Sequence, residues 1–243
     1  MTDFSSHAAL DAASRLRKAA KIERLICECG QSPIGGRMLE VGTGSGFISE
    51  YFAARYKHVL RVDAVDVTDQ RVASEGFHFQ TYDGERLPFS DGVFDLMVSN
   101  HVIEHVGSRQ RQQAHLLELA RVMSPGGLIY LAAPSRWQLV EPHFGLIGLS
   151  WIPQSMRDGY VRLAGKGDRY DCNPMGHREL ERMAQCVGLR AHNLNARAFR
   201  AICEESGGAP GTWLRRIPLA WLEAAYRVSP TMVYLLSHET DHT

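Results

Sequence analysis

The sequence predicts an α/β fold, built on a mostly parallel sheet of seven strands with helices on both faces. Short apolar runs alternate with helix-length segments along most of the chain, and this order is typical of parallel sheets because helices form the crossovers. Hydrophobic residues make up 44% and charged residues 22% of the 243 positions, as in ordinary globular domains. We therefore expect one domain over residues 1–243.

Each predicted strand is a short apolar or β-branched run next to glycine, proline or polar residues. The seven runs are residues 37–41, 59–67, 77–82, 93–99 and 128–133, a part of 190–198, and residues 232–237.

The first predicted helix covers residues 8–29, where apolar side chains recur at helical spacing with arginine and lysine between them. Gly30 and Pro33 are expected to end it. The other predicted helices are residues 47–56, a segment around 69–74, residues 108–123 and 177–186, and a part of 214–228.

Residues 134–176 interrupt the alternation after the fifth strand. At about 40 residues this stretch is longer than an ordinary connection, so we interpret it as an insertion that forms a lid or a substrate wall, with a helix within 152–163. Its rings could line an acceptor pocket or form the insertion's own core, and its basic residues could be solvated or contact an anionic acceptor or lipid head group. The rings are Trp137, His143, Phe144, Trp151, Tyr160 and Tyr170, and the basic residues are Arg157, Arg162, Lys166 and Arg169.

The overall charge and the cysteine pattern narrow the function classes. Basic and acidic residues number 27 each, so no net field attracts nucleic acid. The five cysteines contain no Cys-x-x-Cys pair, which indicates free thiols in a reducing compartment. No leader peptide and no apolar run of about 18 residues is present, so we expect a cytoplasmic protein without an integral membrane segment. The sequence leaves the oligomeric state open.

The strand at 37–41 leads into a glycine-rich loop with Gly42, Gly44 and Gly46. Such a loop lets the backbone approach a ligand closely, and its amides can bind an anionic group. A dinucleotide fingerprint would need glycine where the chain has Phe47, which disfavours a nicotinamide oxidoreductase. Asp66 stands at the end of the second strand, where a carboxylate can bind ribose hydroxyls. Asp63 lies within that strand, so we prefer Asp66.

Three segments together resemble the class I S-adenosylmethionine-dependent methyltransferases, of the small-molecule, domain 11 type. Residues 38–47 resemble the first motif of that superfamily, residues 65–67 the second, and residues 82–96 the stretch that bridges its third and fourth strands. The resemblance implies a Rossmann-like fold and S-adenosyl-L-methionine as cofactor.

Carried over position by position, the resemblance implies a cofactor site. Glu40 and the loop 42–46 would hold the methionine portion, Asp66 would bind the ribose, Asp83 and Gly84 would flank the adenine, and residues 99–101 would lie near the methionine end. The predicted cofactor-binding residues are Glu40, Gly42, Thr43, Gly44, Gly46, Asp66, Val67, Asp83, Gly84 and Asn100.

The catalytic candidates are His143, His105 and Glu104. Residues 101–105 match His-x-x-Glu-His, a zinc-protease pattern, but they follow an apolar strand, which argues against that reading. Glu104 and His105 could instead satisfy backbone groups at a helix start or help to orient a substrate hydroxyl pair through a metal; the prediction assigns no metal. His143 lies in the predicted insertion and is the first candidate base, ahead of His105.

The expected activity is methyl transfer to a small molecule, with oxygen preferred because no Asn-Pro-Pro-Tyr motif follows the fourth strand. Acceptors of secondary-metabolite, glycan or lipid type fit this expectation. Nitrogen and carbon acceptors, and a non-catalytic cofactor-binding regulator, are the alternatives.

Overall fold

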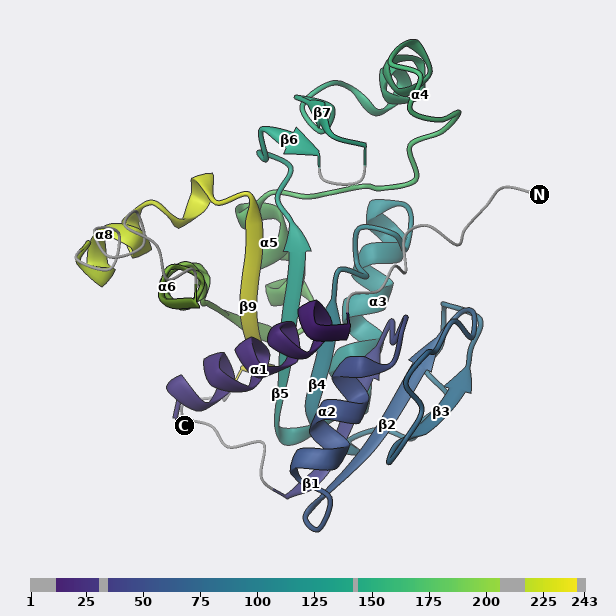
Figure 1. Ribbon diagram of the computed structural model, residues 1–243, viewed down its shortest axis with the longest axis vertical. Coiled ribbons are helices and arrows are strands. Elements are labelled where there is room, and N and C mark those ends of the chain that lie inside the picture. The colour runs from purple at the N-terminus through teal and green to yellow at the C-terminus, as the bar shows by residue number, and fades with distance from the viewer. Residues whose placement is uncertain (1–11, 31–34, 142–143, 206–216, 240–243) are drawn as a thin grey trace.

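A seven-stranded sheet forms the centre of the computed structural model, which describes residues 12–30, 35–141, 144–205 and 217–239 (Figure 1). The strand order is β3-β2-β1-β4-β5-β9-β8. Strand β9 is antiparallel to both of its neighbours, and the other pairs are parallel. The predicted mostly parallel sheet is therefore confirmed. The strands are β1 (Gly36–Val41), β2 (Leu60–Asp66), β3 (His78–Thr81), β4 (Phe94–Asn100), β5 (Met123–Pro134), β8 (Leu189–Asn193) and β9 (Thr231–His238).

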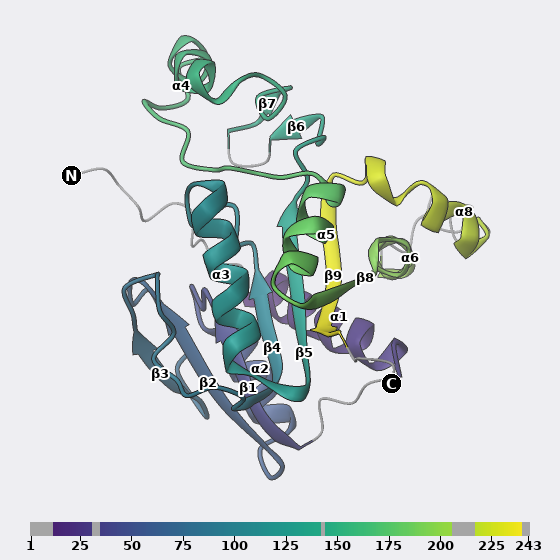
Figure 2. The same cartoon turned by 180° about the vertical axis from the view of Figure 1, so that it is seen from behind.

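Helices cover both faces of the sheet, as Figures 1 and 2 show from opposite sides. One face carries α1 (Ala12–Glu28), α2 (Phe47–Arg55) and α6 (Asn195–Glu205), and the other carries α3 (Arg109–Val122) and α5 (His177–Cys186). A buried apolar cluster fills the space under each layer. The predicted helices on both faces are thus confirmed, and the sheet is enclosed as parallel sheets usually are.

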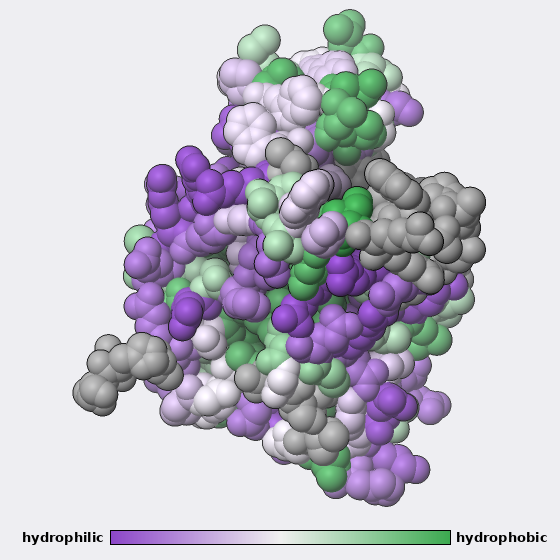
Figure 3. All heavy atoms as spheres, turned by 90° about the vertical axis from the view of Figure 1, so that its left-hand side faces the viewer, coloured by the Kyte–Doolittle hydropathy of each residue, from purple (hydrophilic) through white to green (hydrophobic). Residues whose placement is uncertain are grey.

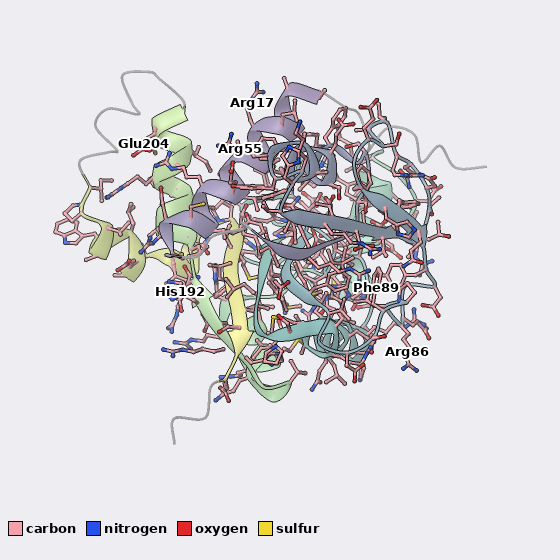
Figure 4. The ribbon with its side chains drawn as sticks, turned by 90° about the horizontal axis from the view of Figure 1, so that it is seen from below. Arg17, Arg55, Arg86, Phe89, His192 and Glu204 are labelled. Atoms are coloured by element: carbon pink, nitrogen blue, oxygen red, sulfur yellow. The ribbon has the colours of Figure 1, made fainter. Side chains whose placement is uncertain are left out.

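Ion pairs fix helix α1 to its two neighbours. Glu23 of α1 accepts a hydrogen bond from Arg55 of α2 at 2.9 Å, and Arg24 pairs with Glu204 of α6. Figure 4, seen from below, shows Arg55 and Glu204 on the two helices that flank α1. These ion pairs hold the C-terminal half of α1 against α2 and α6.

The helix predicted around residues 69–74 is wrong, because this segment is irregular. The backbone amides of Val72 and Ala73 both donate to the carbonyl oxygen of Ser45, at 3.0 and 2.9 Å. Those amides therefore bind the glycine loop instead of the carbonyls four residues earlier, which a helix would require. The segment serves as a support for the loop.

Helix α6 was not predicted, and the strand expected within 190–198 ends at Asn193. The side chain of Asn193 accepts a hydrogen bond from the amide of Asn195 at 2.9 Å, which caps the start of α6. Leu194, Ala198 and Ala201 are buried at helical spacing and face the core. These two signals could have identified the helix from the sequence.

Parts of two predicted helices lie outside the described residues. They are residues 8–11 and 214–216, together with Pro33, the expected terminator. The rest of the last predicted helix forms the short helix α8 (Leu219–Ala224) and a 3-10 turn (Tyr226–Val228).

Residues 134–176 extend beyond the carboxyl end of β5, at the top of Figures 1 and 2. They contain the two-stranded ribbon of β6 (Val140–Glu141) and β7 (Leu146–Ile147), followed by α4 (Gln154–Leu163). Tyr170 contributes to a small buried cluster in this segment, so part of its aromatic content forms its own core. The assignment of the segment to substrate binding stays a prediction.

Apolar side chains also gather on the surface at this end of the molecule, where Figure 3 shows hydrophobic atoms. Among the described residues, no helix is both long and apolar enough to cross a bilayer. The exposed apolar residues of the segment are Trp137, Leu139, Val140, Ile147, Trp151, Met156 and Leu163.

Candidate functional site

A cavity of about 750 Å³ lies at the edge of the sheet where β1 to β4 end. This volume is within the range of small-molecule sites. Because β3, β2, β1 and β4 are neighbours in that order and run parallel, the segments that follow them lie in a row along this edge. Helices α1 and α3 supply further lining residues.

The glycine loop after β1 forms one wall. Gly42, Gly44 and Gly46 have φ values of 78°, 52° and 86°, a region that side chains disfavour. A Cβ at Gly42 would lie 2.3 Å from Cγ2 of Val102, and one at Gly46 would lie 2.1 Å from the carbonyl oxygen of Ala73. A Cβ at Gly44 would meet no other residue within 4 Å. Gly42 and Gly44 line the cavity, while Gly46 permits tight packing behind it.

The two aspartates of β2 occupy different environments. Asp66 lines the cavity, and its carboxylate accepts hydrogen bonds from the amides of Gly44 at 2.8 Å and Val67 at 2.7 Å. Asp63 is 1% exposed and pairs with Arg37 at 2.7 Å. Only Asp66 is therefore placed to meet a ligand in the cavity, and Asp63 has a structural role.

The turn after β3 closes this end of the cavity with Asp83, Gly84 and Tyr82. Asp83 accepts a hydrogen bond from the amide of Glu85 at 2.8 Å, which helps to hold the pKa of its carboxyl group below the usual value. Burial raises the pKa of Tyr82 to about 12, and the carboxylate of Asp66 adds to the shift. The ring of Tyr82, which sequence reasoning missed, thus meets the cavity as a neutral phenol.

Besides Gly46, three predicted cofactor residues, Glu40, Thr43 and Asn100, do not line the cavity. Glu40 is buried and accepts hydrogen bonds from the amide of Ser49 at 3.0 Å and its hydroxyl at 2.5 Å. Burial raises the pKa of Glu40 to about 8, against the opposing effect of these bonds. Thr43 is also buried and donates to the carbonyl of Val65 at 3.1 Å. Glu40 and Thr43 thus hold the glycine loop from behind, and Asn100 is half-buried at the end of β4.

The segment after β4 contributes imidazoles. His101 and His105 line the cavity, and Nδ1 of His101 lies 3.2 Å from Oε1 of Glu104. Glu104 is 1% exposed, and its Oε2 has no hydrogen-bond partner among the described residues. His101 has a φ of 60°, a strained value for histidine, and its amide donates to the carbonyl of Ala132 at 2.7 Å. The segment is a turn, so the helix that a zinc protease needs is absent from this described stretch.

Side chains from two helices complete the lining. Arg15 comes from α1, and Arg111, Ala114 and His115 come from α3. Burial lowers the pKa of His115 to about 4, so this imidazole is neutral at neutral pH. The sequence showed both helices but did not show which of their faces would meet the cavity. The lining residues outside the residues and segments of the predicted site are Arg15, Gln70, Tyr82, Glu85, Val102, Val106, Gln110, Arg111, Ala114 and His115.

The returning arm of the 134–176 segment reaches the same place. The amide of Asn173 donates to the carbonyl of Glu104 at 2.7 Å, and Sγ of Cys172 lies 3.7 Å from Nδ1 of His105. Burial and the neighbouring Asp171 carboxylate raise the pKa of the Cys172 thiol. His143, the first candidate base, lies outside the described residues.

The central part of the chain is similar to known proteins. Residues 39–131 match the family model described as a methyltransferase domain. A malonyl-[acyl-carrier protein] O-methyltransferase of Serratia marcescens is 33% identical over 135 residues, which cover 54% of this chain and 50% of that protein. A ubiquinone biosynthesis O-methyltransferase of Parvibaculum lavamentivorans is 27% identical over 135 residues, which cover 50% of this chain and 51% of that protein. The chain spans about half the length of these curated relatives.

The fold is also similar to that of a solved structure. Phosphoethanolamine N-methyltransferase 2 of Haemonchus contortus, in complex with S-adenosyl-L-methionine, superposes with a TM-score of 0.53 and 16% sequence identity. The match covers 89% of this chain and 51% of that one, so the similarity includes segments outside residues 39–131.

Proposed function

We propose that the protein is a class I S-adenosylmethionine-dependent methyltransferase that methylates a hydroxyl oxygen of a small-molecule acceptor, since residues 39–131 match a methyltransferase domain. One observation carries the proposal. A single cavity combines carboxylates after β2 and β3, a glycine loop after β1 and imidazoles after β4. The carboxylates suit the ribose and adenine, the glycine loop suits the methionine portion, and the imidazoles suit the reacting atoms.

The cavity fits S-adenosyl-L-methionine in both size and chemistry. Asp66 would bind the ribose hydroxyls, since its carboxylate is already oriented by two backbone amides. Asp83 and Gly84 would flank the adenine, beside the neutral ring of Tyr82. The open space in front of Gly44 would let the backbone approach the methionine portion. Glu40 and Thr43 would act from behind, by holding the loop.

The bound cofactor supplies an electrophilic methyl group, whose bond to sulfur breaks, leaving the electron pair on sulfur, as the acceptor oxygen forms its bond to carbon. The protein must then position that oxygen and receive its proton. His101, hydrogen-bonded to Glu104, and His105 are the described imidazoles of the turn after β4 that line the cavity, and histidine is the usual side chain for this role. His115 is too weak a base at neutral pH, because burial depresses its pKa.

Two features support the acceptor class. The two curated relatives named above are O-methyltransferases, which favours oxygen over nitrogen or carbon. The segment 134–176, whose returning arm contacts the turn of Glu104 and His105, carries exposed apolar side chains, and these favour an acceptor with a lipid-like or ring-shaped portion. The balanced charge of the chain gives no support to a nucleic-acid substrate.

Calorimetry followed by a transfer assay tests the proposal. S-adenosylhomocysteine should bind the purified protein and raise its melting temperature, while NAD should do neither. Incubation with methyl-labelled cofactor and a pooled metabolite extract should then label a small molecule through an ether or ester oxygen. Binding of NAD alone would overturn the cofactor assignment. Tight S-adenosylhomocysteine binding without transfer to any extract or macromolecule would indicate a regulator.

A further inference from the structure

His105, Asp171 and Cys172 bring three different metal-binding groups to one point, although His105 and Cys172 are 67 residues apart in the chain. Sγ of Cys172 lies 3.7 Å from Nδ1 of His105 and 3.6 Å from Oδ1 of Asp171. One ligand atom from each residue lies within 4.8 Å of the others. We infer that these three side chains form a zinc-type cation site at the boundary between the cavity and the 134–176 segment.

The spacing of the three atoms matches tetrahedral coordination. Zinc bonds of about 2.3 Å to sulfur and about 2.0 Å to nitrogen or oxygen place neighbouring ligand atoms roughly 3.5 Å apart. The distances from Sγ of Cys172 to His105 and to Asp171 are close to this value, so an ion could enter with little movement of Cys172. Thiolate and imidazole ligands favour zinc over magnesium, which prefers oxygen.

The backbone around the ligands is fixed on both sides. Next to Cys172, the amide of Asn173 donates to the carbonyl of Glu104 at 2.7 Å, and its side chain donates to the carbonyl of Gly107 at 2.9 Å. The carbonyl of Asn173 accepts hydrogen bonds from Gln112 at 2.8 Å and from Arg109 at 2.9 Å. The two segments that carry the ligands are thus fastened together, as a preorganised metal site requires.

The local charge suits a cation. Asp171 brings one carboxylate, and the thiol of Cys172 loses its proton to solvent when a metal binds. Glu104 lies in the same turn as His105 and is buried, with Oε2 lacking a hydrogen-bond partner among the described residues. These groups would offset the two positive charges of zinc.

Three protein ligands leave one tetrahedral position open, the arrangement of catalytic zinc sites. His105 lines the cavity, so that position can face an acceptor. This role rests on the proposed function. An acceptor hydroxyl bound there would lose its proton more readily and reach the methyl carbon as an oxyanion. His105 would then serve as a ligand, and His101 with Glu104 would remain to receive the proton.

Metal binding can be measured without any acceptor. Protein stripped with a chelator should bind one zinc ion per chain in calorimetry, and cobalt(II) should give a thiolate-to-metal charge-transfer band. Cys172→Ser should abolish that band, and both Cys172→Ser and the exposed Asp171→Asn should weaken zinc binding at least 10-fold. Cys186→Ser, at an exposed thiol on α5, should bind like wild type. Unchanged binding in both ligand variants, or no binding by wild type, would overturn the site.

S-adenosylhomocysteine binding, measured on the same samples, separates the two proposals. Zinc binding without S-adenosylhomocysteine binding would leave the metal site standing and refute the proposed cofactor. S-adenosylhomocysteine binding by a protein that takes up no zinc would refute the metal site alone.

Discussion

The carboxylate of Asp66 accepts a hydrogen bond from the backbone amide of Gly44 at 2.8 Å. This bond joins the end of β2 to the glycine loop after β1, so the two elements that would hold the ribose and the methionine portion form one unit. A ligand that replaces the Gly44 amide as partner of Asp66 would also loosen the loop. Ribose binding at Asp66, as proposed, would therefore be coupled to the position of the loop.

Replacing Asp66 by Asn should weaken S-adenosylhomocysteine binding by roughly 10- to 100-fold, the loss expected for hydrogen bonds to a charged group. Calorimetric titration at neutral pH measures this loss. Asp63→Asn is the matched comparison, since it removes the buried partner of Arg37 and should lower the free energy of unfolding without acting on the ligand directly. Wild-type affinity in the Asp66 variant would show that the carboxylate does not touch the ligand.

In the absence of ligand, Gly46→Ala should lower the free energy of unfolding more than Gly44→Ala does. Both positions have positive φ, which costs an ordinary side chain about 1 to 2 kcal/mol. Gly46→Ala adds a clash, because its Cβ would lie 2.1 Å from the carbonyl oxygen of Ala73, whereas the Cβ at Gly44 would enter open space. Denaturant unfolding of the two variants gives the difference in free energy. Equal losses would mean that the backbone at Ala73 moves aside freely.

The parts of the fold and site that the sequence predicted are those encoded by neighbouring residues. Residues 42–46 and Asp66 belong to short motifs whose spacing fixes their position at strand ends, and the structure places Gly42, Gly44 and Asp66 on the cavity wall. The mostly parallel sheet followed from the alternation of apolar runs, because a crossover constrains the direction of the next strand.

The parts that were missed depend on contacts between distant segments. Arg15 and His115 reach the cavity because of how α1 and α3 lie on the sheet, and their spacing along the chain does not encode this. The approach of Cys172 to His105 depends on the path of the 134–176 segment. The helix predicted near 69–74 failed for a similar reason, since the carbonyl of Ser45 takes its amides.

The identity of the proton acceptor can be decided by comparing imidazole variants. His101→Asn should lower kcat by about 100-fold or more with little change in S-adenosylhomocysteine affinity, because asparagine tolerates the positive φ at this position. His58→Asn, at an exposed histidine before β2, should retain wild-type turnover.

His143→Ala tests the base expected from the sequence in the same assay. A large loss of kcat in this variant, with wild-type turnover in His101→Asn, would assign the proton to His143 and remove His101 from the mechanism. The reverse result would give the role to the pair of His101 and Glu104.

Ionisation of Glu40 should make the protein less stable as the pH rises from about 4.5 to about 8. Its carboxyl pKa is raised from 4.5 to about 8 in the folded protein, chiefly by burial. Within this window the folded state binds more protons at Glu40 than the unfolded state, so the free energy of unfolding falls with pH. The stabilisation from protonated Glu40 is fully present below pH 4.5 and is lost above pH 8. Between these values the free energy of unfolding falls by about 1.4 kcal/mol for each pH unit.

Glu40→Gln keeps a side-chain oxygen for Ser49 but cannot ionise, so the difference in unfolding free energy between wild type and this variant should change across the window. Denaturant unfolding of both proteins at a series of pH values measures it, and parallel profiles would show that Glu40 is ionised throughout.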